Sequence, residues 1–228
     1  MKHEGKATKA ALNIVLKSLV VLVVLIALGV LAKYVGPHVG TLTKVFIALW
    51  IVFVGFTLYF FRDPEPLQPH EPNLVVAPAH GTVDVIGETT EPEFMGGVCQ
   101  RVSIFLSIID VHVQQAPVSG RVAYFKHSPG QFLNAMKADC AAFNENVLIG
   151  FEPVDRPAEK IGVRLIAGLL ARRILPWVTT GEVVPRSERI SMIQFGSRCD
   201  LYLPRGAKIK VKLGQKVIGG QSIVAAFD

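Results

Sequence analysis

The chain is poor in cysteine and lacks any strong clustering of charge, and both features limit what it can be. Its 228 residues include three cysteines, Cys99, Cys140 and Cys199, an odd number without metal-ligand spacing. No metal site is therefore expected, and a reducing compartment suits these thiols best. The net charge is +6. The basic residues are scattered, and many N-terminal ones flank apolar segments, so we expect no nucleic-acid partner.

Two long apolar runs explain the positive mean hydropathy of +0.42. They cover residues 18–32 and 45–61, with Gly36-Pro37 breaking the chain between them. Each approaches the roughly 20 residues that a membrane-spanning helix needs. A secretory signal is the alternative for the first run. The closely following second run, and the lack of a clear small-x-small cleavage site, favour a membrane hairpin over residues 1–62.

The lysines and arginines around these runs predict an orientation in the membrane. More basic residues lie outside the hairpin than in its loop: Lys2, Lys6, Lys9, Lys17 and Arg62 outside, and Lys33 and Lys44 inside. Because basic flanks tend to stay in the cytoplasm, we expect both ends of the hairpin there. The protein is then located at the cell membrane, with the domain that follows the hairpin on the cytoplasmic side.

A proline-rich linker, residues 63–73, separates the hairpin from a domain at 74–228 with short β-like runs. The predicted strands are 74–76, 82–86, 101–109, 121–125, 146–151, 190–195, 200–203, 208–212 and 222–226. One amphipathic helix is predicted over Lys160–Ile174. The predicted fold class is therefore mainly β (α+β), a compact lipoyl-like sandwich domain with one or two amphipathic helices.

The β-like region contains an internal echo. Residues 77–83 and 116–122 both follow the pattern Ala-Pro-x-x-Gly-x-Val. The echo predicts two equivalent turns that enter equivalent strands, and hence pseudo-symmetry within one domain.

The pair Gly196-Ser197 is the main candidate for chemistry. It follows the predicted strand 190–195 and precedes the strand 200–203. Glycine lets the backbone bend sharply and lets a neighbouring hydroxyl approach its carbonyl. That is the geometry of a serine that cleaves its own chain.

Two histidines are candidate partners of this serine. His112 lies in a predicted strand whose alternation places it on the same face as Asp110. An imidazole can deprotonate a serine or protonate a carbanion at neutral pH. His80 lies in the first Ala-Pro turn. The alternative is that His112 is a structural histidine and His80 an ordinary turn residue.

The basic residues of the predicted helix have two interpretations. The helix either packs against the core with a solvated basic face, or lies on anionic lipid. In the second case Arg164, Arg172 and Arg173 are candidate contacts for a lipid headgroup.

Several motifs in this order and spacing resemble one family. They are Phe60-Phe61-Arg62-Asp63-Pro64, Val76-Ala77-Pro78-Ala79-x-Gly81, Asp110-Val111-His112-Val113, Ala116-Pro117-Val118-Ser119-Gly120, Gly162-Val163-Arg164 through Ala171-Arg172-Arg173, and Phe195-Gly196-Ser197-Arg198. From about residue 60 to the end, the chain resembles short, proteobacterial-type phosphatidylserine decarboxylase proenzymes.

The resemblance implies a pyruvoyl enzyme. Ser197 would attack the Gly196 carbonyl and divide the chain into β (1–196) and α (197–228) chains, which stay together as a heterodimer or higher oligomer. The pyruvoyl group left at residue 197 would form a Schiff base with phosphatidylserine and accept the electron pair as carbon dioxide leaves. His112 would then supply the proton that yields phosphatidylethanolamine.

The sequence departs from this family at the first turn. The family usually carries aspartate where this chain has His80, and often asparagine where it has Gln114. An aspartate would orient His112 and stabilise its charge. Three alternatives follow: His80 acts directly, Asp84 or Asp110 replaces the aspartate, or self-cleavage is impaired.

Two other functions compete with the decarboxylase. A degenerate family member would bind lipid without turnover. The Ala-Pro turns and residues 208–220 also resemble lipoyl-like or membrane-fusion-adaptor modules, but no lipoyl-type lysine hairpin is present.

Overall fold

The computed structural model describes residues 4–32, 39–71, 73–131, 143–168, 173–194 and 197–227. Contacts divide the chain into two compact units, one of residues 5–63 and one that begins at residue 64.

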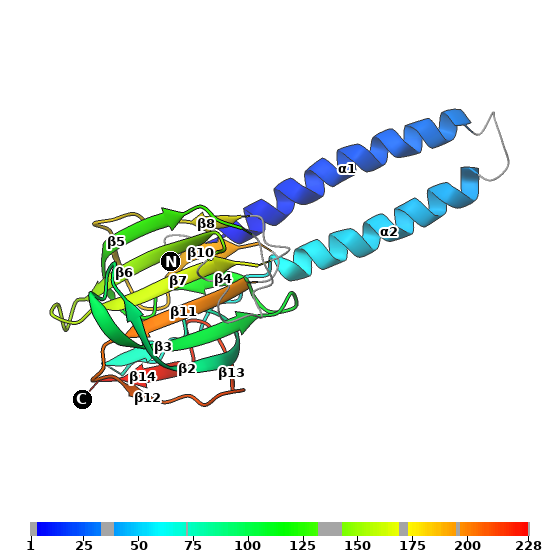
Figure 1. Cartoon of the computed structure of the whole chain (residues 1–228). Coiled ribbons are helices and arrows are strands. Elements are labelled where there is room, and N and C mark those ends of the chain that lie inside the picture. The colour runs from blue at the N-terminus through cyan, green and yellow to red at the C-terminus, as the bar shows by residue number, and fades with distance from the viewer. Residues whose placement is uncertain are drawn as a thin grey trace. The chain divides into compact units, whose positions relative to one another are not determined.

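The first unit is a pair of apolar helices, α1 (Lys6–Ala32) and α2 (Val39–Phe60) (Figure 1). Both are long and apolar enough to cross a membrane. Leu16 on α1 is 65% exposed and Val52 on α2 is 68% exposed. Large apolar side chains exposed in such numbers are typical of a surface that meets lipid or another partner. The predicted apolar hairpin is confirmed, and it is compatible with membrane association.

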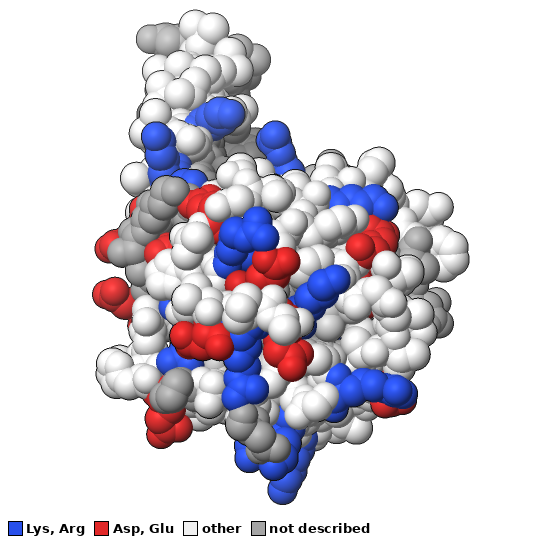
Figure 2. Space-filling view, turned by 90° about the vertical axis from the view of Figure 1, so that its left-hand side faces the viewer, with Lys and Arg blue, Asp and Glu red and all other residues white. Residues whose placement is uncertain are grey.

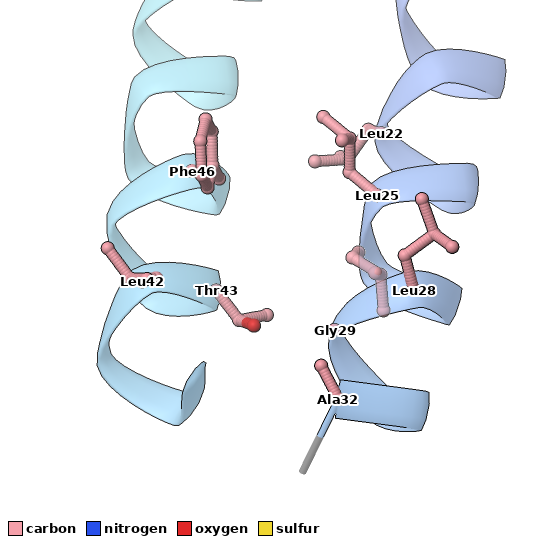
Figure 3. Close-up of a pocket in the computed structure, with 9 residues that line it drawn as sticks. Leu22, Leu25, Leu28, Gly29, Ala32, Leu42, Thr43 and Phe46 are labelled. Atoms are coloured by element: carbon pink, nitrogen blue, oxygen red, sulfur yellow. The ribbon is translucent and has the colours of Figure 1, made fainter. Parts of the chain in front are cut away.

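A polar contact and an apolar gap lie between these two helices. The Trp50 indole donates to the Ser18 hydroxyl (3.2 Å), which donates in turn to the Val15 carbonyl (2.8 Å). An N–H group in an apolar environment needs such a partner. The gap, about 270 Å³, is lined by Leu22, Leu25, Ile26, Leu28, Gly29, Ala32, Leu42, Thr43 and Phe46 (Figure 3). None of these side chains ionises, so the gap suits hydrocarbon and not headgroup chemistry.

The second unit is built from short and long strands. They are β1 (Leu74–Val76), β2 (Gly81–Glu91), β3 (Gly97–Leu106), β4 (Val113–Gln115), β5 (Gly120–Ser128), β6 (Asn146–Pro153), β7 (Ile161–Ala167), β8 (Ile174–Pro176), β9 (Val183–Val184), β10 (Arg189–Ile193), β11 (Ser197–Leu203), β12 (Lys208–Ile209), β13 (Lys216–Val217) and β14 (Ile223–Ala226).

These strands form one large curled sheet and two small ones (Figure 1). The large sheet has the order β13-β2-β3-β11-β7-β6-β5-β9, and the small sheets are β1-β14-β12 and β4-β10-β8. Strand β11 lies between β3 and β7, antiparallel to both. Its residues Cys199, Leu201 and Leu203 join the main hydrophobic core. Because side chains alternate along a strand, Arg198 and Asp200 face the other side of the sheet.

The predicted internal repeat is present in the fold. The Val76 amide donates to the Pro117 carbonyl (3.0 Å), and the Gln115 amide donates to the Pro78 carbonyl (2.8 Å). The two Ala-Pro turns therefore bond to each other reciprocally. Strand β1 leads through the first turn into β2, and β4 leads through the second into β5. The predicted equivalence of the turns and strands is confirmed.

The equivalence extends to C-terminal segments that show no evident sequence echo. Val217 of β13 pairs with Gly81, and Val184 of β9 pairs with Gly120. Gly220 and Ser187 follow these strands and have φ angles of 72° and 67°. A serine in this left-handed region is strained by about 1–2 kcal/mol. Its buried hydroxyl offsets part of that strain by donating to the Gly220 carbonyl at 2.6 Å.

The predicted helix over Lys160–Ile174 is wrong. Residues 161–167 form strand β7, and Ile174 begins the short strand β8. Ile161, Val163 and Leu165 alternate with Gly162 and Arg164, which is the period of a strand. The β-branched residues also favour a strand, and β6 and β11 supply the backbone partners. In the described part of residues 74–228 there is no amphipathic helix; residues 169–172 lie outside it.

Candidate active site

Ser197 lies at the start of β11, in the middle of the large sheet. It pairs with Leu106 on one side and Ala167 on the other. Its side chain is fully buried, and its hydroxyl has no hydrogen-bond partner among the described residues. An unsatisfied buried hydroxyl costs about 1–3 kcal/mol and so needs an explanation, for which reactivity is one candidate. Gly196, the other half of the predicted cleavage site, lies outside the described residues.

The backbone of His112 lies beside Ile193, four residues before Ser197. Leu106 pairs with Ser197, and the His112 carbonyl accepts from the Ile193 amide at 3.2 Å. The ends of the two connections, residues 106–112 and 193–197, are therefore close to each other, with Leu106 beside Ser197 and His112 beside Ile193.

The hydrogen bond at its Nδ1 atom fixes the tautomer of His112. The side chain is 1% exposed, and Nδ1 lies 2.9 Å from the main-chain carbonyl oxygen of Asp110. A carbonyl oxygen only accepts, so Nδ1 carries the proton. In the neutral ring, Nε2 then carries the lone pair. A main-chain carbonyl thus holds the imidazole in the tautomer that a general base needs.

Gln114 contacts the main chain of His112, and this contact was not predicted from the sequence. Its amide nitrogen donates to the His112 carbonyl (2.8 Å), and its amide oxygen accepts from the Ser191 hydroxyl (2.6 Å). Gln114 is fully buried. Gln114 could have been recognised as a candidate from its position two residues after His112, where the family often has asparagine. Ser191, on β10, gave no local signal because the contact is long-range.

His80 lies in the turn between β1 and β2, against the segment that carries His112. It is half-buried, and the preceding Pro78 carbonyl accepts from the Gln115 amide. Gly219 also lies close to His80. A Cβ atom at Gly219 would lie 2.2 Å from the Gln115 Oε1 atom and 3.0 Å from the His80 Cδ2 atom. A side chain at position 219 would therefore displace Gln115, and this close approach packs His80 next to a residue three positions from His112.

The two carboxylates considered as substitutes for the family aspartate have other partners. Both carboxylate oxygens of Asp84 accept from the Arg198 guanidinium, at 3.0 and 2.5 Å. The Asp110 carboxylate accepts from the Ser107 amide at 2.8 Å and closes the turn before His112. Asp110 reaches the imidazole through its main-chain oxygen instead.

The candidate headgroup arginines do not gather in one place. Arg164 contacts Glu91 (3.3 Å) and lies opposite Asp200, on the sheet face away from the core. Arg173 is exposed, and its carbonyl accepts from the Gln194 amide at 3.2 Å. The structure therefore brings Arg173, and not Arg164, to the segment before Ser197. Arg172 lies outside the described residues.

The domain surface mixes charges of both signs. On the face shown in Figure 2, acidic and basic side chains are interspersed. Exposed pairs join Arg121 to Glu152 (2.6 Å) and Lys126 to Glu93 (2.9 Å). The positive net charge does not form one basic field on this face.

Asp200 is a buried acid on the same strand as Ser197. Burial raises the pKa of its carboxyl above the usual range, although Arg101, 4.0 Å away, favours the charged form. The folded state therefore binds this proton more tightly than the unfolded state. Stability from the neutral carboxyl is present below the ordinary aspartate pKa and is lost as the pH rises through the higher folded pKa.

Asp200→Asn is expected to relieve this cost at neutral pH. The variant should gain stability over the wild type as the pH rises from 4 to 7, with a melting-temperature difference that grows by about 2–4 °C for each kcal/mol relieved. Thermal unfolding at several pH values measures this difference. A difference that stays constant across this range contradicts the assigned cause.

Comparisons with known proteins agree on one family. The phosphatidylserine decarboxylase family profile matches residues 53–225. A phosphatidylserine decarboxylase proenzyme from Symbiobacterium thermophilum is 40% identical over 88% of this chain and 89% of its own length. One from Azorhizobium caulinodans is 40% identical over 92% and 86%, and one from Desulfotalea psychrophila is 38% identical over 77% and 81%. The chain therefore belongs to the phosphatidylserine decarboxylase family.

Proposed function

We propose that this chain is a self-processing decarboxylase that converts phosphatidylserine to phosphatidylethanolamine at a membrane. The observation that carries the proposal is the buried hydroxyl of Ser197, which has no partner within the described part of the chain, in a protein of this family whose His112 bonds to Ile193, four residues before that serine. Family membership favours this function over a lipoyl-like adaptor. The pairing of the Ala-Pro turns supports the fold and does not discriminate between the two functions.

Self-cleavage begins with the Ser197 hydroxyl. Its oxygen attacks the Gly196 carbonyl as a base removes the proton, and the resulting ester replaces the amide bond and frees the Ser197 nitrogen. Loss of the Ser197 α-proton expels the Gly196 carboxylate and leaves dehydroalanine. Addition of water releases ammonia and leaves a pyruvoyl group at residue 197. The Nε2 atom of His112 is the base that the hydrogen bonding favours.

The surroundings of Ser197 fit a pyruvoyl group at this position. That group would supply an electron sink for decarboxylation. Strands β3 and β7 pair with residue 197 on both sides, and its side chain is fully buried, so its position is fixed by the sheet. His112 then returns a proton to the substrate carbon. Its Nδ1 bond to the Asp110 carbonyl orients the ring, and the bond from Gln114 to its main-chain carbonyl fixes its backbone during both steps.

Exposed apolar side chains border the same end of the sheet, which suggests that this end faces lipid. Ile108 and Ile109 follow Leu106 and are 44% and 56% exposed. Phe143, 59% exposed, precedes Asn144, whose amide donates to the Ala167 carbonyl at 2.7 Å. Leu106 and Ala167 flank Ser197. A bilayer on this side would deliver the headgroup to residue 197. The basic flanks of the hairpin favour the cytoplasmic leaflet.

Replacing Ile109 with aspartate is expected to weaken activity on bilayers selectively. Losing the burial of one isoleucine in lipid should lower kcat/KM on phosphatidylserine vesicles by about 10-fold or more. Activity on a short-chain, dispersed phosphatidylserine should stay unchanged. Val183→Asp is the matched control, because Val183 is 65% exposed on β9, across the sheet. Equal losses on both substrates would contradict a lipid-facing role.

The function itself is tested with purified full-length protein in detergent. Phosphatidylserine should be consumed with equal formation of phosphatidylethanolamine and carbon dioxide. Pretreatment with a hydrazine reagent should abolish turnover by trapping the reactive carbonyl. A cleaved protein that traps hydrazine but leaves phosphatidylserine intact would refute the substrate assignment. A protein that neither traps hydrazine nor turns over would support the degenerate-member or adaptor alternatives.

A further inference from the structure

Arg198, the residue directly after Ser197, carries a cation into the interior of the domain. Its side chain is 1% exposed. The guanidinium donates through both terminal nitrogens to the two oxygens of the Asp84 carboxylate, at 3.0 and 2.5 Å. Such a two-pronged pair fixes orientation as well as distance. A buried cation that loses its carboxylate is strongly disfavoured, so the pair is expected to be kept.

A β-bulge aims Asp84 at this arginine. Val83 pairs with Ile104 and Val85 pairs with Ser103, so Asp84 is an extra residue in β2. Bulges commonly redirect a side chain. Strand β3 separates β2 from β11, and the ion pair between Arg198 and Asp84 joins the two strands across it.

The pseudo-symmetry provides an internal comparison. Strand β5 is equivalent to β2 and has the same bulge, because Val122 and Tyr124 pair with consecutive residues of β6 and Ala123 is extra. Each bulge accepts a hydrogen bond from a glycine of a separate turn. The Gly214 amide donates to the Val83 carbonyl (2.7 Å), and the Gly181 amide donates to the Val122 carbonyl (2.8 Å). The bulge therefore needs no carboxylate. Of the two bulge residues, only Asp84 in β2 carries a carboxylate; the equivalent residue in β5 is Ala123.

We infer that the Arg198–Asp84 ion pair is a positioning device for residue 197, before and after the chain is cut. Cleavage removes the covalent link to residue 196. The backbone pairing of Ser197 and the side chain of Arg198 then hold the new chain end in place. The pair lies on the sheet face away from the core, while the Ser197 side chain points to the opposite face. Asp84 and Arg198 thus orient residue 197 without touching the reacting atoms. This role rests on the proposed function.

Asp84→Asn in the full-length protein tests this role, because it keeps the shape of the side chain and removes its charge. Slower self-cleavage is expected, seen as uncleaved chain by intact mass. For the cleaved fraction, counted by carbonyl trapping, kcat on phosphatidylserine should fall by up to about 100-fold, since small misplacements of a reacting group cost that much. KM should stay within about twofold, because the pair does not contact substrate.

Two further variants separate positioning from general stability. Asp84→Glu keeps the carboxylate and should recover most of the cleavage and kcat. Glu88→Gln is the matched control on the same strand. Its partner Arg205 is 3.3 Å away, both side chains are more than 60% exposed, and such a pair contributes little. If Asp84→Asn folds too poorly to assay, Arg198→Lys replaces it, and an intermediate loss of kcat is expected because lysine lacks the planar fork.

Several results would overturn the inference. Complete cleavage and wild-type kcat in Asp84→Asn would do so, as would equal losses in Glu88→Gln or a folded Asp84→Glu no better than Asp84→Asn. An active wild type with an unaffected Asp84→Asn refutes only the ion-pair role. A wild type that neither cleaves nor decarboxylates refutes the proposed function itself.

Discussion

Ser197→Ala is expected to remain a single uncut polypeptide without decarboxylase activity. Alanine has no oxygen to attack the Gly196 carbonyl, and it cannot become a pyruvoyl group. The folded structure should not suffer, because the lost hydroxyl is buried and has no hydrogen-bond partner among the described residues. Removal of such a group is neutral or stabilising. A denaturing gel, carbon dioxide release and thermal unfolding together measure all three effects.

Ser103→Ala is the matched control for this substitution. Ser103 lies on the neighbouring strand β3 and is also fully buried, but on the opposite sheet face from Ser197. Its loss should leave cleavage complete. Splitting of the Ser197→Ala chain at the same position would contradict the assignment of the nucleophile. A folded, cleaved Ser103→Ala protein together with an uncleaved Ser197→Ala protein would support it.

His112→Ala is expected to have the second-largest effect. Loss of a general acid and base lowers rates by about 100- to 10,000-fold, so turnover per trapped carbonyl should fall in that range. Self-cleavage should also slow, because in the proposed mechanism the same Nε2 atom accepts the Ser197 proton. The measurement is kcat on phosphatidylserine, with intact mass reporting the cleaved fraction.

His127→Ala controls for the removal of an imidazole. His127 is about half exposed and contacts Glu145 at 3.0 Å, on the outer strand β5. It should cleave and turn over as the wild type does. If His112→Ala keeps full kcat, the proton donor is another group. If it cleaves normally but fails in decarboxylation, His112 acts only in the second reaction.

The sequence predicted correctly those elements whose structure depends on residues close together in the chain. The apolar hairpin followed from the length of two hydrophobic runs, and the paired Ala-Pro turns followed from their repeated residues. The helix over Lys160–Ile174 was mispredicted because its apolar residues satisfy both a helical and a strand period. Tertiary pairing decided the outcome: β6 and β11 bond to both edges of residues 161–167. The β-rich neighbourhood and the glycine at position 162, a poor helix former, are the sequence features that favour a strand.

The candidate catalytic residues could be proposed from the sequence, but the residues that hold them in position could not. Ser197 and His112 were proposed from the sequence because the ordered motifs that contain them resemble those of the decarboxylase family. Asp84 and Arg198 are 114 residues apart in the chain, and nothing local indicates their contact. The same holds for Gln114 and Ser191. Such partners depend on strand register and on a bulge, which long-range packing fixes.

The repeated architecture also explains why an adaptor module seemed a reasonable alternative. The Ala-Pro turns build the pseudo-symmetric fold, and a fold hosts many functions. The difference lies in what the two halves carry. One bulge holds Asp84, bonded to the residue after Ser197, whereas the equivalent bulge holds Ala123. The ion pair next to Ser197 is therefore a feature of only one of these two bulges.

The intact mass of the purified full-length protein tests self-processing most directly. Two chains are predicted, one ending at Gly196 and one covering residues 197–228 with a pyruvoyl group in place of Ser197. The smaller chain should resist N-terminal sequencing and gain mass with a hydrazine reagent. A single chain with the unmodified mass of all 228 residues, in protein purified from its native host, would contradict the proposed mechanism.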